Sequence, residues 1–274
     1  MIYLLYLILG LAPSIIWLLF FLRKDVHPES NRMIILVFLL GIAIVPLVAI
    51  AECLPISFDF DCFLPWFFEN FFPSPWGGLL YMFLGIALIE EVGKYLVVKF
   101  KVLRDPEFDE PLDVMLYMII AALGFAAIEN ILVLFFPEKP LLIQEASVIT
   151  AFRFVGATFL HALCSGTIGY FLARSFFHPK KKRLLLFVGF GLATILHGLF
   201  NFSIIKIGES LIVKAGTITI ANSQVFYSHL TLLVAILVGL AIFVTLGFKN
   251  LKKIASVCIP NLPSTARRPG SKIK

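Results

Sequence analysis

Ionisable and amide side chains recur inside otherwise apolar stretches of this 274-residue chain. The first group lies in the segment L-I-E-E-V-G-K-Y and the second in G-F-A-A-I-E-N-I, and others follow further along. A charged group at the centre of a bilayer costs several kcal/mol, on the order of 3 by insertion scales, so each one is a functional candidate. The candidates are Glu90, Glu91, Lys94, Glu129, Asn130, Arg153, His161, His197 and Asn201.

These residue types are those that hydrolysis needs. A carboxylate held in a water-filled pocket can act as a general base on water, and a neutral histidine can orient that water. The Asn201 amide could donate to a developing oxyanion. Lys94 and Arg153 would neutralise buried carboxylates. A structural alternative remains open at each position, because an ion pair can also fix helix packing and a histidine can bridge two helices.

Helical spacing brings some of these groups onto shared faces. Glu90 and Lys94, and likewise His197 and Asn201, are four residues apart and so lie about 40° apart around a helix. Arg153 and His161 fall in one apolar block, two turns apart and about 80° round. Glu90, Glu129, His161 and His197 lie in four successive apolar blocks, each near the middle third of its own block, which predicts that they converge at one depth in the membrane.

The elements that must position these groups are transmembrane helices. The chain is 60% apolar and 15% charged, with a mean hydropathy of +0.97, whereas soluble domains have about 45–50% apolar and about 25% charged residues. About 20 apolar residues cross a bilayer as a helix. Seven blocks are long enough: 2–22, 33–51, 77–98, 112–136, 146–177, 184–205 and 225–248. We therefore predict an all-α polytopic membrane protein with about seven transmembrane helices.

The distribution of basic residues predicts the topology. Eighteen lysines and arginines lie in the loops 23–32, 99–111 and 174–183 and after residue 248, against three in the other loops. By the positive-inside rule the N-terminus is outside and the C-terminus is cytoplasmic. The net charge of +6 is thereby explained by topology, and no nucleic-acid partner is expected. We predict one transmembrane domain over 1–250, whose spans at about 77–205 hold the candidate residues, and a basic, disordered cytoplasmic tail over 251–274.

The segment 52–76 contains four acidic residues, no basic residue and a dense run of Trp and Phe. Such a segment is typical of the membrane interface, where aromatic rings can be half buried. Cys53 and Cys62 share this predicted oxidising side and could form a disulfide, which the sequence alone leaves open. Cys164 is predicted to serve packing.

At these residues the chain resembles the PrsW family of prokaryotic intramembrane proteases, which shares a superfamily with the CAAX prenyl endopeptidases. The resemblance covers about residues 80–205, and it implies that the domain over 1–250 is a transmembrane protease domain with its catalytic spans at about 77–205. The motifs that carry it are Glu90-Glu91-x-x-Lys94, Phe125-x-x-x-Glu129-Asn130, His161 and His197-x-x-x-Asn201. CAAX enzymes typically have a histidine where this chain has Glu129, which favours the PrsW branch.

The resemblance implies a multi-pass protein of the prokaryotic cytoplasmic membrane that cleaves membrane-anchored proteins. The implied substrate is an anti-sigma factor, cut at site one in an envelope-stress response. Glu90 or Glu91 would be the general base, Glu129 would assist the water, and His161 would complete the site. His197 and Asn201 would hold the oxyanion. Lys94, Asn130 and Arg153 would support them.

The family is described both as glutamate-type and as metal-dependent. The chain lacks HExxH, the helical zinc signature, and we favour a site without a cofactor. If zinc is bound, the expected ligands are Glu91, Glu129, His161 and His197. Two other functions remain open: a proton- or ion-coupled transporter and a CAAX-type prenyl-protein endopeptidase. The sequence predicts no oligomeric state.

Overall fold

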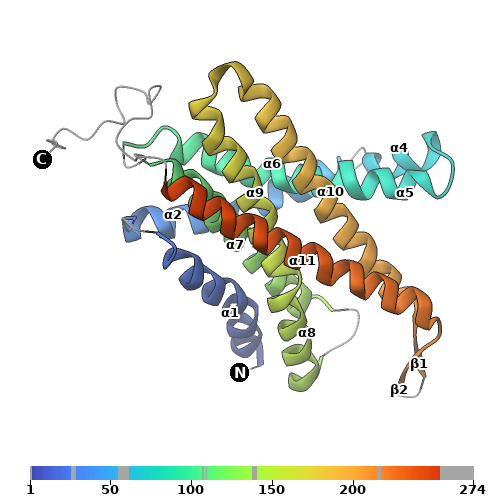
Figure 1. Ribbon diagram of the computed structural model, residues 1–274. Coiled ribbons are helices and arrows are strands. Elements are labelled where there is room, and N and C mark those ends of the chain that lie inside the picture. Colours follow the sequence, from blue (N-terminus) through green and yellow to red (C-terminus); the bar gives the residue numbers. More distant parts are fainter. Residues whose placement is uncertain are drawn as a thin grey trace, which may run out of the picture.

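The protein is a bundle of long helices with one short β-hairpin (Figure 1). The computed structural model describes residues 2–25, 29–54, 62–106, 108, 110–137, 141–214 and 217–253. Its elements run in the order α1 (Ile2–Leu22), α2 (Asn31–Ala43), α3 (Val45–Cys53), α4 (Phe63–Phe71), α5 (Trp76–Leu80), η1 (Tyr81–Ala87), α6 (Leu88–Val97), η2 (Val98–Val102), α7 (Pro111–Phe135), α8 (Ile143–Val155), α9 (Ala157–Phe177), η3 (Pro179–Lys181), α10 (Lys182–Glu209), β1 (Leu211–Lys214), β2 (Thr217–Ile220) and α11 (Ser223–Lys252).

The predicted all-α polytopic membrane fold is confirmed. Within the described residues, six helical stretches are long and apolar enough to span a membrane: Ile2–Leu22, Asn31–Cys53, Pro111–Phe135, Ile143–Phe177, Pro179–Glu209 and Ser223–Lys252. The remaining predicted block, 77–98, lies in an unbroken helical run from α5 to η2 that contains two π-helical segments. This run carries Glu90, Glu91 and Lys94 in its second half.

Helix α7 forms the centre of the bundle. Every residue from Pro111 to Ala127 is buried, and α7 packs against α1, α2 and α9. Two glycines allow the closest of these approaches. A Cβ atom at Gly124 would meet the carbonyl oxygen of Phe38, and a Cβ atom at Gly41 would meet that of Ala121. The backbones of α2 and α7 therefore touch where neither helix has a side chain.

The predicted block 146–177 is divided by a break at Gly156 into α8 and α9. Arg153 and His161 consequently lie on two helices, and the angle of about 80° expected for one continuous helix does not apply.

The chain around the acidic aromatic segment is partly described. A disulfide joins Cys53 at the end of α3 to Cys62 before α4, so the pairing that the sequence left open is present. Aromatic rings of α4 stack on one another, with Trp66, Phe71 and Trp76 exposed. In Figure 1, α4 and α5 project to one side of the bundle. Their location at the membrane interface stays a prediction.

Further expectations concern a loop, the chain ends and Cys164. The chain between the predicted blocks 184–205 and 225–248 contains the end of α10 and the antiparallel pair β1–β2, in which Leu211 pairs with Ile220. Helix α11 continues to Lys252, and the predicted tail lies outside the described residues from 254 onward. The orientation of the termini and the division at residue 250 stay predictions. Cys164 is free and buried, as expected of a packing residue.

Candidate active site

The ammonium group of Lys94 is at the centre of a buried polar cluster. Its Nζ donates to Glu90 Oε2 at 3.1 Å and to Glu91 Oε1 at 2.8 Å, both within helix α6. It also donates to Nδ1 of His161 on α9, at 2.8 Å. Lys94 and Glu91 are fully buried. The three donors of the ammonium thus all have acceptors, which offsets the cost of burying the charge.

In each histidine of the cluster, one ring nitrogen contacts a carboxylate. Nδ1 of His197, on α10, lies 3.1 Å from Glu91 Oε1. Nε2 of His161 lies 2.8 Å from Glu129 Oε2 on α7. Because the ammonium of Lys94 can only donate, Nδ1 of His161 is an acceptor and Nε2 carries the proton that Glu129 accepts. Four helices, α6, α7, α9 and α10, therefore contribute to one site.

The second nitrogen of each histidine lies on the side of Glu90. Nδ1 of His161 is 3.6 Å from Glu90 Oε2, and Nε2 of His197 is 3.8 Å from the same atom. The two imidazole rings are perpendicular, with centroids 5.0 Å apart. The structure therefore places two imidazole nitrogens and one carboxylate oxygen around a common point.

Arg153 reaches the site from the end of α8. Its Nε donates to Asn130 Oδ1, and its Nη2 donates to Glu129 Oε2 at 3.4 Å. Asn130 in turn donates to Thr158 Oγ1 on α9, at 3.0 Å. The Glu129 side chain is 25% exposed, compared with 8% for Glu90 and 0% for Glu91. Glu129 is thus the carboxylate of the cluster with the greatest exposure.

Asn201 is one turn beyond His197 and partly buried. In the part of the chain that the structure describes, it forms no hydrogen bond with the cluster. The proposed oxyanion donor therefore stays a prediction. The other eight sequence candidates meet in one hydrogen-bonded group, and Phe125 contributes its ring, over which Lys94 Nζ lies 4.5 Å from the centroid.

Ser165 is a site residue that the sequence analysis missed. Its Oγ donates to Glu91 Oε2 at 2.7 Å, and the side chain is fully buried. Serine is common in transmembrane helices, so its type gives no signal. Its spacing does, because Ser165 is four residues after His161 and so lies on the same face of α9.

Replacing Ser165 with alanine is expected to weaken the site and not the fold alone. One oxygen of a fully buried carboxylate would lose its donor, at a cost of about 1–3 kcal/mol. Because Glu91 orients His197, we expect the hydrolytic activity predicted for this cluster to fall about tenfold, the lower end of the loss on removing an outer hydrogen-bond partner of a site. The two measurements are the rate of substrate hydrolysis and the temperature of thermal unfolding. Ser175→Ala is the matched control, since Ser175 is buried on α9 and donates to Leu172 in its own helix. Equal effects of the two variants would contradict the role of Ser165.

The residues present fit a metal ion. Glu90, His161 and His197 are buried and offer three ligand atoms that lie within 4.8 Å of one another. Two histidines and one glutamate are a known catalytic zinc set. Histidine ligands commonly donate their other ring nitrogen to a carboxylate, which is how His161 and His197 meet Glu129 and Glu91. This set differs from the sequence prediction, which named Glu91 and Glu129 and not Glu90.

Comparison with known proteins identifies the family to which the chain belongs. The model of the PrsW family intramembrane metalloprotease matches residues 29–246. Protease PrsW of Oceanobacillus iheyensis is 32% identical over 194 residues, covering 70% of this chain and 80% of that protein. The chain belongs to the PrsW family. Protease PrsW of Geobacillus kaustophilus is 32% identical over 195 residues, 70% of this chain and 76% of that protein. That of Bacillus subtilis is 29% identical over 196 residues, 70% of this chain and 79% of that protein.

No solved structure matches the chain. Membership of the PrsW family makes this chain an intramembrane protease and a multi-pass bacterial membrane protein. The transporter and CAAX-type alternatives are therefore set aside. The family is described as metalloproteases, and the group Glu90, His161 and His197 could hold the metal.

Proposed function

We propose that this PrsW-family protease hydrolyses peptide bonds at the cluster of Glu90, His161 and His197, with a zinc ion as the resident cofactor. The observation that carries the proposal is the pairing of each histidine. His197 meets Glu91 through Nδ1 and His161 meets Glu129 through Nε2, so the remaining nitrogens lie on the side of Glu90. Such outer carboxylates fix the orientation of metal-ligating imidazoles.

The charges of the cluster support a bound cation. Glu90, Glu91 and Glu129 are three carboxylates, whereas Lys94 and Arg153 are two cations within the same hydrogen-bonded group. A zinc ion would supply Lewis acidity toward the scissile carbonyl and toward a bound water. It would compete with Lys94 for Glu90 and for Nδ1 of His161, while the bond from Lys94 to Glu91 would remain.

We assign each residue of the cluster a role in the reaction. Glu129 is the most exposed carboxylate of the cluster, and we assign it the role of general base: it takes the proton from the attacking water and passes it to the leaving amine. Arg153 holds Glu129 in place through Nη2. Glu91 orients His197, and Ser165 and Lys94 hold Glu91. Asn201 is assigned to the oxyanion by the family resemblance.

Metal analysis tests this assignment. We expect about one zinc per purified chain, loss of cleavage after chelation and recovery when zinc is returned. The His197→Ala variant should lose both the metal and the activity. A metal-free protein that cleaves at the full rate would overturn the metal assignment and leave a glutamate-activated water, with Glu90 or Glu91 as the base.

The substrate we propose is a single-span membrane-anchored protein of the anti-sigma-factor kind, cut at site one to start an envelope-stress response. The support for it is the family resemblance. A tagged single-span anti-sigma factor expressed with this chain should be shortened on its extracytoplasmic side. If only unrelated membrane proteins are cut, the substrate class is wrong and the hydrolytic assignment stands.

A further inference from the structure

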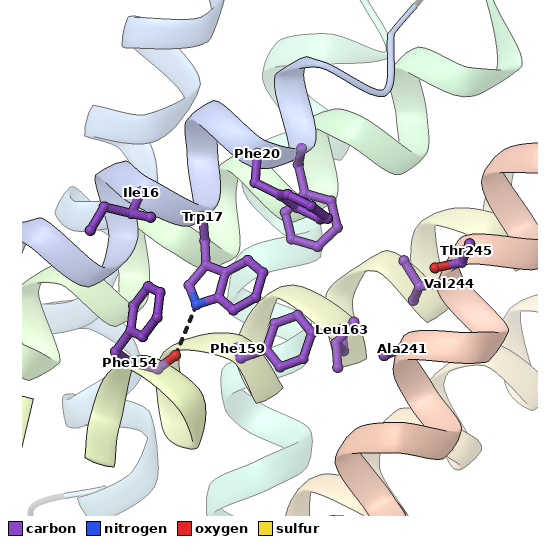
Figure 2. A pocket seen from close by; sticks show the side chains of 10 residues that line it. Ile16, Trp17, Phe20, Phe154, Phe159, Leu163, Ala241, Val244 and Thr245 are labelled. Atoms are coloured by element: carbon purple, nitrogen blue, oxygen red, sulfur yellow. Dashed lines mark hydrogen bonds between the residues drawn. The ribbon is translucent and has the colours of Figure 1, made fainter. Parts of the chain in front are cut away.

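We infer that Trp17, on α1, is a positioning residue for the reaction: it holds the break between α8 and α9 and thereby sets the place of Arg153. Its indole Nε1 donates to the backbone carbonyl oxygen of Phe154 at 2.8 Å. Phe154 directly follows Arg153. Figure 2 shows this hydrogen bond and the rings around it.

The carbonyl of Phe154 needs a donor because of the break. In a continuous helix it would accept from the amide of Thr158, four residues on. The break at Gly156 separates the two helices here, and the indole of Trp17 provides the N–H. A backbone carbonyl without a donor is costly within a membrane, where no water replaces the lost partner. Trp17 therefore stabilises the broken arrangement over a continuous helix.

The ring of Trp17 also binds both sides of the break. It stacks on Phe154, near the end of α8, with centroids 5.3 Å apart and planes at 22°. It stacks on Phe159, in the first turn of α9, with centroids 4.0 Å apart and planes at 11°. One side chain of α1 thus fixes the two helix ends relative to each other.

Arg153 transmits this placement to the active site. It is the residue before Phe154, and its guanidinium donates to Asn130 and to Glu129. A shift of the last turn of α8 would move the guanidinium away from Glu129, which also accepts from His161. Trp17 itself forms none of these polar contacts, so its effect on catalysis passes through Arg153.

The space beside Trp17 makes the inference testable by substitution. Trp17 forms one wall of an apolar cavity of about 370 Å³, with Thr245 on α11 at another wall (Figure 2). A smaller ring at position 17 enlarges a space that already exists and forces no overlap. Trp17→Phe keeps an aromatic ring and removes the N–H.

The inference rests on the role of Arg153 in the proposed function, so the experiment is a double-mutant cycle on the full chain in vesicles. Trp17→Phe should lower kcat for a single-span substrate about fivefold, the effect of one hydrogen bond, and leave KM unchanged. In the Arg153→Gln background, Trp17→Phe should have no further effect. Thr245→Val, in the wall of the same cavity, should leave both constants unchanged.

The possible results separate two failures. If Arg153→Gln cleaves at the wild-type rate, the role of Arg153 in the proposed function is wrong. If Arg153→Gln lowers kcat but Trp17→Phe alone leaves kcat at the wild-type value, the positioning role of Trp17 is wrong. It is also wrong if Trp17→Phe lowers kcat by the same factor with Arg153 present and with Arg153→Gln. Should Trp17→Phe fail to accumulate, 3-benzothienylalanine at position 17 retains the double ring without the N–H. The same reduced kcat and the same dependence on Arg153 are expected for it, and wild-type kcat would overturn the inference.

Discussion

Replacing Glu90 with glutamine is expected to abolish cleavage, by at least about a thousandfold, the scale of losing a central catalytic group. Glu90 Oε2 is the atom toward which Nδ1 of His161 and Nε2 of His197 both lie, at 3.6 and 3.8 Å. Glutamine has the same shape and can still accept from Lys94, so the helix contacts should survive. It lacks the negative charge that completes a two-histidine, one-carboxylate zinc set.

Three measurements check the effect of Glu90→Gln: cleavage of a tagged single-span substrate, zinc content and membrane accumulation. Accumulation should match the wild type while zinc and cleavage are lost. Glu209→Gln is the control, because Glu209 is exposed and pairs with Lys206 at the far end of α10. A Glu90→Gln protein that retains zinc and cleaves at a normal rate would contradict the proposed site. Loss of the protein from the membrane would instead assign Glu90 a structural role.

Replacing Gly124 with valine is expected to destabilise the fold by about 3 kcal/mol or more, the scale of overpacking a rigid contact. A Cβ atom there would overlap the carbonyl oxygen of Phe38, which belongs to the backbone of α2 and cannot rotate away. The contact is reciprocal, since a Cβ atom at Gly41 would overlap the carbonyl oxygen of Ala121. Separating the helices at this point would open the contact between α2 and the central helix α7.

Thermal unfolding in detergent and membrane accumulation measure the effect of Gly124→Val. The matched control is Gly239→Val, because a Cβ atom at Gly239 would have no atom within 4 Å. Gly239→Val should be neutral or slightly stabilising, since glycine is a weak helix former. Equal stability of the two variants would show that the backbones of α2 and α7 separate without cost.

The composition and order of residues already determined the class of protein and most of the site. The hydrocarbon interior accepts only internally bonded helices, and for that reason apolar blocks about 20 residues long predicted the spans. The same cost makes buried ionisable groups rare, so Glu90, Glu129, His161 and His197 stood out against their neighbours. Spacing along one helix also predicted the bond between Glu90 and Lys94.

The partners across helices were decided by the tertiary structure. Residues that face lipid and residues that face the core are equally apolar in a membrane protein, so periodicity does not encode how each helix is rotated. The rotation and depth of the helices decide that Ser165 meets Glu91 and that Gly124 meets Phe38. They also decide that Glu90 is the carboxylate that lies near both histidines, while Glu91 and Glu129 each contact one of them. The break at Gly156 also depends on a distant residue. Trp17 donates to a carbonyl 137 positions away, and a contact between such remote residues exists only once the helices have packed.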